Sequence, residues 1–248
     1  MTLNIDAFDA IALARRTGAP RVELFDTVGS SMDEAHRLAE RGAESGTIVV
    51  AERQFSGRGR FGRRWISDPG RGLWATFIYR GVDVAGLDVL SIRTGVALAP
   101  MLDRFASGRV MIKWPNDLFV GGLKLGGILI EARWRDVSLE WVAIGIGINL
   151  IPPADQARAT ALRAGVLRSE ILCVVAAEVG RACAKAGNLT LDELRDFHAR
   201  DFAHDAVLAE PAPGRARGIT PNGALVVETA SGRELFRRGS LVFQPGAE

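Results

Sequence analysis

A run of arginines and glycines is the segment of this sequence best suited to bind an anion. Residues 57–65 read GRGRFGRRW and contain Arg58, Arg60, Arg63 and Arg64. Guanidinium groups make paired, charge-assisted hydrogen bonds to phosphates and carboxylates, and glycines leave the backbone free to change conformation. Ordering such a loop costs about 1–2 kcal/mol per residue, which is comparable with the stabilisation from each charged contact. We therefore expect the loop to close only when a ligand is bound. By itself, the segment is equally compatible with a solvated basic loop or a nucleic-acid contact.

Two further segments place polar side chains where strands begin and end. Residues 113–117 read KWPND, in which the proline favours an extended turn that leaves Asn116 and Asp117 to bond the backbone or a ligand. Residues 124–131 read KLGGILIE, and glycines within a strand mark close approach by a ligand or another backbone. The ammonium group of Lys124 would there stabilise negative charge on an attacked phosphate. A structural turn and an exposed lysine are the alternatives for these segments alone.

A second pair of strand glycines precedes an amide side chain. Residues 145–149 read GIGIN, so side chains are removed from one face of a predicted strand, against which a purine or a helix can lie. Asn149 offers both a donor and an acceptor. The three histidines, His36, His198 and His204, have no partner at a catalytic spacing, and we predict no catalytic role for them.

The patterns between these segments predict an α+β fold, with a mixed β-sheet and flanking helices. Strands are expected over 22–25, 47–52, 73–79, 110–114, 125–132 and 139–150, and helices over 33–41, 87–105, 169–185 and 191–202. Pro100 is expected to kink or interrupt the second helix. Short strands with turn signals follow, so we expect a main domain over 1–203 and a small β-barrel domain over 204–248.

Composition sets limits on partners and location. The 248 residues are 48% hydrophobic and 24% charged, with a net charge of +2, so no overall field directs the chain to nucleic acid or a membrane. Residues 1–18 lack the apolar run of a secretory signal, and no stretch reaches the roughly 18 apolar residues that a membrane span needs. We predict a soluble cytoplasmic protein that binds neither DNA nor membranes.

Taken together and in this order, the segments resemble those of the biotin–protein ligases, also called biotin–[acetyl-CoA-carboxylase] ligases, over roughly residues 22–150. The likeness is weaker in the C-terminal region. The resemblance implies a catalytic domain like that of class II aminoacyl-tRNA synthetases, followed by an SH3-like barrel. It also implies an enzyme that uses ATP and Mg²⁺ to convert biotin to biotinyl-5′-AMP, and that transfers the biotinyl group to a lysine of a biotin carboxyl carrier protein.

The same resemblance assigns residues to the site. It implies that Lys124 and Arg60 stabilise charge during catalysis, while no general base and no metal-ligating side chain is identified. The residues expected to bind biotin are Ser30, Ser31, Gln54, Arg58, Gly59, Arg60 and Lys124. The residues expected to bind ATP are Arg58, Arg60, Arg63, Asn116, Asp117 and Asn149.

Two features depart from the family pattern. Met32 stands where the family usually has asparagine, which removes a polar side chain from the edge of the biotin pocket. No tryptophan follows Asn149 in the chain, so the sequence does not identify what replaces a tryptophan that stacks on adenine in some relatives.

Three further expectations concern the form of the protein and its alternatives. About twenty residues precede the first predicted strand, too few for a three-helix DNA-binding unit, so we expect the form without an N-terminal DNA-binding domain. An edge strand can pair two copies into a homodimer. A lipoate or octanoate ligase or transferase of the same fold is the alternative enzyme, and a nucleic-acid-binding module that uses the arginine–glycine loop is the alternative outside enzymes.

Overall fold

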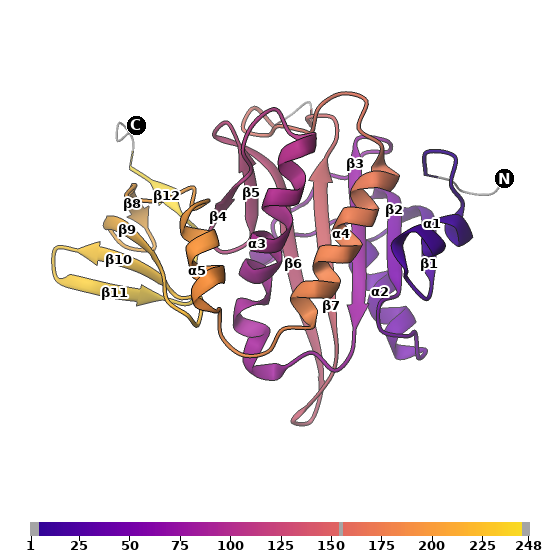
Figure 1. The fold of residues 1–248 in the computed structure, drawn as a ribbon, viewed down its shortest axis with the longest axis horizontal. Coiled ribbons are helices and arrows are strands. Elements are labelled where there is room, and N and C mark those ends of the chain that lie inside the picture. The colour runs from indigo at the N-terminus through magenta and orange to yellow at the C-terminus, as the bar shows by residue number, and fades with distance from the viewer. Residues whose placement is uncertain (1–4, 154–155, 245–248) are drawn as a thin grey trace.

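The computed structural model describes residues 5–153 and 156–244, and a seven-stranded mixed sheet lies at its centre (Figure 1). Its strand order is β1-β2-β3-β7-β6-β5-β4. β1 and β2 are parallel, which requires a crossover between them, and all other neighbours are antiparallel. The strands are β1 (Val22–Val28), β2 (Ile48–Gln54), β3 (Gly72–Tyr79), β4 (Met111–Lys113), β5 (Asp117–Val120), β6 (Leu123–Arg135) and β7 (Ser138–Asn149).

Helices cover both faces of this sheet, so a central strand such as β3 is buried along nearly its whole length. α3 (Leu90–Leu102) and α4 (Arg168–Cys183) lie side by side on one face (Figure 1). α2 (Ser31–Glu40) packs on the other face, against β2, β3 and β7. α1 (Ala10–Thr17) contacts β1 and α4. The face under α2 is the one that carries the candidate site.

The predicted fold class is confirmed, with two elements that were not predicted. α1 has only eight residues, of which Leu13 alone is buried, and β5 begins at the last residue of KWPND, so that the segment reads as one turn. The turn at Gly121 and Gly122, both at positive φ, therefore joins β5 to β6. The predicted helix over 191–202 ends earlier, as α5 (Leu191–His198).

The predicted helix over 87–105 also differs from expectation. α3 continues through Pro100 and ends two residues later at Leu102, with 3₁₀ turns before and after it, because the proline falls in the last helical turn. By length and composition, Val84–Phe105 is apolar enough to span a membrane, which corrects the expectation that no such stretch exists. More than half of its most apolar window is buried inside the protein, where α3 packs on β4, β5, β6 and α4.

A second sheet of five short antiparallel strands follows α5, as predicted for the C-terminal region. Its order is β11-β10-β9-β8-β12, and it lies beside the β4 end of the main sheet (Figure 1). Asn222 and Gly223 lie between two of its strands, and Ser231 and Gly232 lie where the turn from β10 enters β11. The strands are β8 (Val207–Glu210), β9 (Gly214–Ile219), β10 (Leu225–Thr229), β11 (Gly232–Phe236) and β12 (Val242–Phe243). The domain boundary at residue 204 stays a prediction.

A buried ion pair joins the main sheet's helices to the chain that leads into this second sheet. The Nε of Arg93 on α3 lies 2.9 Å from Oε1 of Glu193 on α5, and both side chains are at most 5% exposed. Arg93 also donates to the carbonyl groups of Gly187 and Asn188. Burial alone would raise the pKa of Glu193, but hydrogen bonds from Arg93, the Thr190 backbone and Lys185 outweigh it and lower the pKa to about 2.

This pair predicts a stability that depends on pH. A lowered carboxyl pKa stabilises the fold above the ordinary value of 4.5, and that contribution is lost as the pH falls from 4.5 through 2. Replacing the carboxylate by an amide (Glu193→Gln) should lower the free energy of unfolding at neutral pH by about 3–5 kcal/mol, because Arg93 keeps its charge without a partner. Urea unfolding followed by circular dichroism should show this difference shrink between pH 4.5 and 2; a difference that stays constant would contradict the assignment.

Candidate active site

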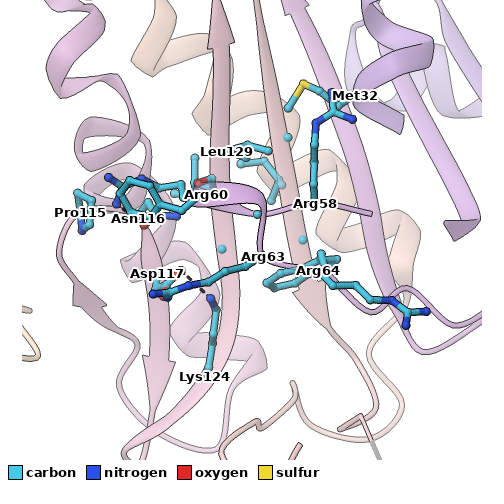
Figure 2. Close-up of a pocket in the computed structure, with 18 of the residues that line it drawn as sticks. Met32, Arg58, Arg60, Arg63, Arg64, Pro115, Asn116, Asp117, Lys124 and Leu129 are labelled. Atoms are coloured by element: carbon cyan, nitrogen blue, oxygen red, sulfur yellow. Dashed lines mark hydrogen bonds and ion pairs between the residues drawn. The ribbon is translucent and has the colours of Figure 1, made fainter. Parts of the chain in front are cut away.

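A cavity of about 270 Å³ lies on the α2 side of the main sheet, and its floor is a patch of strand without side chains (Figure 2). Gly127 on β6 pairs directly with Gly147 on β7, and Gly145 lies two residues before Gly147 on the same face. A Cβ at Gly147 would lie 2.5 Å from the indole of Trp65, and one at Gly145 would lie 2.8 Å from Cε of Met32. Gly147 therefore leaves room for the rigid Trp65 ring, whereas at Gly145 the neighbour is the flexible end of the Met32 side chain. The sequence leaves open whether a purine or a helix lies against these glycines. At Gly145 it is a helix, because Met32 belongs to α2.

The indole of Trp65 also forms part of the cavity wall. Its ring meets that of Trp74 edge-on, with centroids 6.1 Å apart. Its Nε1 is buried and has no hydrogen-bond partner among the described residues. A buried indole donor without an acceptor costs stability, so this group is suited to a ligand that carries an acceptor.

Uncharged hydrogen-bonding groups gather at one end of the cavity. Ser30 caps the N-terminus of α2 by accepting from the Met32 amide at 3.3 Å. The backbone amide of Ser31 donates to Oε1 of Gln54 at 2.7 Å, and Nε2 of Gln54 donates to Ser67 at 2.7 Å. These bonds fix which way the Gln54 amide faces. The structure therefore places the predicted biotin-binding residues Ser30, Ser31 and Gln54 together in the cavity lining.

Charged groups gather at the other end (Figure 2). The ammonium group of Lys124 lies 2.8 Å from Oδ1 of Asp117, and 5.2 Å from the centre of the Trp65 ring. Asn116 donates to the Ile128 carbonyl at 2.8 Å, which fixes its Oδ1 toward the cavity side. KWPND and KLGGILIE therefore meet at one point, because β5 and β6 pair in an antiparallel register.

Residues 57–65 form a short hairpin, which we call the arginine hairpin. The Trp65 amide donates to the Gly57 carbonyl at 2.8 Å, and the Gly59 amide donates to the Arg63 carbonyl at 2.7 Å. At its tip, Phe61 and Gly62 both have positive φ, 57° and 69°. A positive φ is strained for a bulky residue such as Phe61, whose side chain is 64% exposed. Closure of this segment on a ligand stays a prediction, and the strained tip is where a rearrangement would begin.

Two of the hairpin's arginines lie at the charged end. Arg60 donates to Oδ1 of Asn116 at 3.3 Å and to the Gly239 carbonyl at 3.4 Å. Arg63 donates to Ser240 at 3.1 Å. Burial lowers the pKa of Arg60, although a guanidinium group stays charged at neutral pH. The segment before β12 therefore reaches from the C-terminal sheet to the cavity, a contribution that the sequence did not reveal.

The other two arginines point elsewhere (Figure 2). Arg58 lies at the Met32 end, where its guanidinium group contacts Asp33 at 2.7 Å and Glu131 at 2.9 Å. The hydrogen bond to Glu131 raises the pKa of Arg58 further above its ordinary value. Arg64 extends away from the cavity centre. The four arginines therefore do not form one phosphate cradle in this structure, and the predicted binding of ATP by Arg58 has no geometric support here.

Asn149 is the predicted site residue that the structure does not bring to the cavity. Its side chain is 4% exposed and donates to the Thr160 carbonyl at 3.0 Å. Its own carbonyl accepts from the Leu162 amide. The amide thus holds the chain that follows β7, and its predicted role in ATP binding remains without support from this geometry.

Comparisons with known proteins agree with this arrangement. The sequence pattern of the Biotin/lipoate A/B protein ligase family matches residues 26–149. The bifunctional ligase/repressor BirA of Bacillus spizizenii is 32% identical over 84% of this chain and 69% of its own length. The biotin–[acetyl-CoA-carboxylase] ligase of Paracoccus denitrificans is 30% identical over 86% of this chain and 97% of its own length.

A solved structure supports the fold independently. The biotin protein ligase of Aquifex aeolicus, in complex with biotin and ATP, superposes with a TM-score of 0.73 at 23% identity, covering 90% of this chain and 98% of the other. The fold and the site thus define an acyl-activating ligase architecture. The chain belongs to the Biotin/lipoate A/B protein ligase family.

The close packing of Trp65 on the glycines of the cavity floor, which we call the glycine floor, can be tested without any ligand. A methyl group at position 147 (Gly147→Ala) would lie 2.5 Å from the rigid indole of Trp65, which must move and expose its ring. We expect a shift in tryptophan fluorescence and a loss of about 1–3 kcal/mol in the free energy of unfolding. The matched control is Gly108→Ala, whose nearest neighbour would lie at an ordinary 3.7 Å. If the two variants gave the same spectrum and stability, the close approach of Trp65 would be refuted.

Proposed function

We propose that this protein is a biotin–protein ligase, which activates biotin with ATP and transfers the biotinyl group to a lysine of a biotin carboxyl carrier protein. The observation that carries the proposal is the polarity of the cavity. Its neutral end, at Ser30, Ser31 and Gln54, suits the uncharged ureido ring of biotin, and its cationic end, at Lys124 and Arg60, suits the carboxylate. The apolar floor between them suits the alkyl chain.

In the first step, a carboxylate oxygen of biotin attacks the α-phosphorus of ATP, and the bond to the leaving pyrophosphate breaks. The product is biotinyl-5′-AMP. Lys124 and Arg60 are both placed at the end where negative charge would build on the α-phosphate. Asp117 neutralises Lys124 in this structure, so the incoming anions must share or displace that ion pair. The structure identifies no side chain that must accept a proton, because an ionised carboxylate needs none.

In the second step, the unprotonated amine of a carrier lysine attacks the carbonyl carbon of the mixed anhydride. AMP leaves with the electron pair, an amide bond forms, and one proton is released. The mixed anhydride must be shielded from water between the two steps. We assign this shielding to the arginine hairpin, whose four arginines all contribute to the cavity lining.

The proposal includes Mg²⁺ that arrives on the phosphates of ATP. Mg²⁺ usually keeps several waters and takes one or two carboxylates beside the substrate phosphates. Within the described ranges, no three His, Cys, Asp or Glu residues gather as a metal-binding group. Asp117 is the carboxylate that lines the cavity, so it is the group that fits a role beside the metal, where the ion would neutralise phosphate charge.

Lipoate or octanoate chemistry is the alternative within the family. Neither molecule carries hydrogen-bonding groups like those of a ureido ring at the end opposite its carboxylate. Binding would therefore leave the polar groups around Gln54 without hydrogen-bond partners from the substrate. A nucleic-acid-binding role is favoured less still, because Arg58 is held by two carboxylates, while Arg60 and Arg63 bond to protein groups in the cavity wall.

Relatives support the remaining parts of the proposal to different degrees. Two relatives, the biotin–[acetyl-CoA-carboxylase] ligases of Paracoccus denitrificans and Mycobacterium tuberculosis, support a carrier protein as partner. A cytoplasmic location is part of the proposal. A homodimer through an edge strand and the absence of a DNA-binding role stay predictions; the edge strands of the main sheet are β1 and β4.

Exchange of labelled pyrophosphate into ATP tests the proposal directly. We expect exchange that depends on biotin and is absent with lipoate or octanoate. Removing the ammonium group (Lys124→Ala) should lower the exchange rate about 10²- to 10³-fold, the usual loss for one charge-stabilising donor. Lys185→Ala is the matched control, because this lysine lies outside the cavity and pairs with Glu193. Exchange driven by lipoate, or an unchanged rate in Lys124→Ala, would overturn the proposal.

A further inference from the structure

A chain of hydrogen bonds links four side chains, from Trp141 to Arg58. Arg58 lies at the start of the arginine hairpin, which we call the foot of the hairpin. The indole Nε1 of Trp141 on β7 lies 3.0 Å from Nδ1 of His36 on α2. His36 Nε2 lies 3.0 Å from Oε2 of Glu131 on β6. Glu131 accepts two bonds from Arg58, at 2.9 and 3.1 Å. Three separate elements are thus connected to the first arginine of the hairpin.

The direction of every bond in this chain is determined by its first member. An indole N–H can only donate, so Nδ1 of His36 must accept and carry no proton. The neutral imidazole then carries its proton on Nε2 and donates it to Glu131. Trp141 is 4% exposed, so water does not offer its N–H an easy alternative partner. The tautomer of His36 is fixed by a neighbour that has no other role in the cavity.

Glu131 is held as a carboxylate by the same contacts. The hydrogen bond from His36 lowers the pKa of Glu131, burial opposes it, and the bonds from Arg58 lower it further, to about 2. Arg58 also reaches Asp33 at 2.7 Å, so its charge is shared between two carboxylates. Both carboxylates belong to the sheet and to α2 rather than to the hairpin. The foot of the hairpin is therefore anchored, while Phe61 at its tip is exposed and strained.

We infer that His36 is a positioning residue: through Glu131 it fixes Arg58, so that the foot of the arginine hairpin stays against the neutral end of the cavity while the tip moves. This inference rests on the proposed function for its kinetic consequence. Arg58 and Gly59 line the cavity near Met32, so a loosened foot should weaken binding of the acid. The charged end, with Lys124 and Arg60, should keep its geometry, so kcat should stay unchanged.

Two amide variants separate the two nitrogens of His36. Glutamine can place a donor where Nε2 stands and keep the bond to Glu131, whereas asparagine reaches only the Nδ1 position facing Trp141. In biotin-dependent pyrophosphate exchange, we expect His36→Asn to raise the KM for biotin about 3- to 20-fold with kcat within about 2-fold. We expect His36→Gln to stay within about 2-fold of the wild type in both constants, and His198→Ala to serve as the unaffected control.

Two readouts do not depend on catalysis. Trypsin should cut after the hairpin arginines faster in His36→Asn than in His36→Gln or the wild type, because only the first loses its anchor. A two-bond ¹H–¹⁵N correlation spectrum of the wild type should show His36 with its proton on Nε2. If the wild type showed no biotin-dependent exchange, the proposed function would fail, and faster cleavage in His36→Asn would still support the anchor.

Other outcomes would overturn the inference. A proton on Nδ1 of His36 would contradict the donor and acceptor directions on which the inference depends. Equal cleavage rates in the asparagine and glutamine variants would show that the contact with Glu131 does not hold the hairpin. A fall in kcat at unchanged KM would place the effect of His36 at the charged end instead.

Discussion

The shape of the cavity depends on the indole of Trp65, which lies in its lining against a patch of glycines on two paired strands. Gly127 and Gly147 pair across β6 and β7, and the Trp65 ring occupies the space where a Cβ at Gly147 would be. The ring in turn lies beneath the Lys124 ammonium group and closes one wall. Any side chain at Gly147 would force the Trp65 ring to move. The glycine floor therefore sets both the depth of the site and the position of its cation.

Around this floor, the fold separates two kinds of polar group. The N-terminus of α2 and Gln54 supply fixed, uncharged donors and acceptors, while the junction of β5 and β6 supplies Lys124 and Asp117. The arginine hairpin spans both ends, with Arg58 held near α2 and Arg60 held near Asn116. In the proposed function, contacts at the two ends would hold a substrate with a neutral head and an acidic tail in one orientation, which favours a productive alignment.

Local sequence patterns were enough for most of this arrangement, and they failed where tertiary contacts decide. KWPND and KLGGILIE predict strand ends because proline and glycine act locally, and the antiparallel register then brings Lys124 to Asp117. The role predicted for Asn149 has no support from the geometry, because its side chain bonds to the Thr160 carbonyl on an irregular segment that no local pattern predicts. His36 seemed isolated because Glu131 and Trp141 are 95 and 105 residues away in the chain. The reach of residues 239–242 into the cavity depends on domain packing, which no local pattern encodes.

The central claim is that the cavity binds biotin in one orientation, and a crystal structure of the protein with biotin and a non-hydrolysable ATP analogue tests it most directly. The account predicts the ureido ring against Gln54 and Ser30, and the carboxylate between Lys124 and the α-phosphate. A ligand bound in the reverse orientation, or a cavity that stays filled by Trp65 while biotin binds elsewhere, would contradict it.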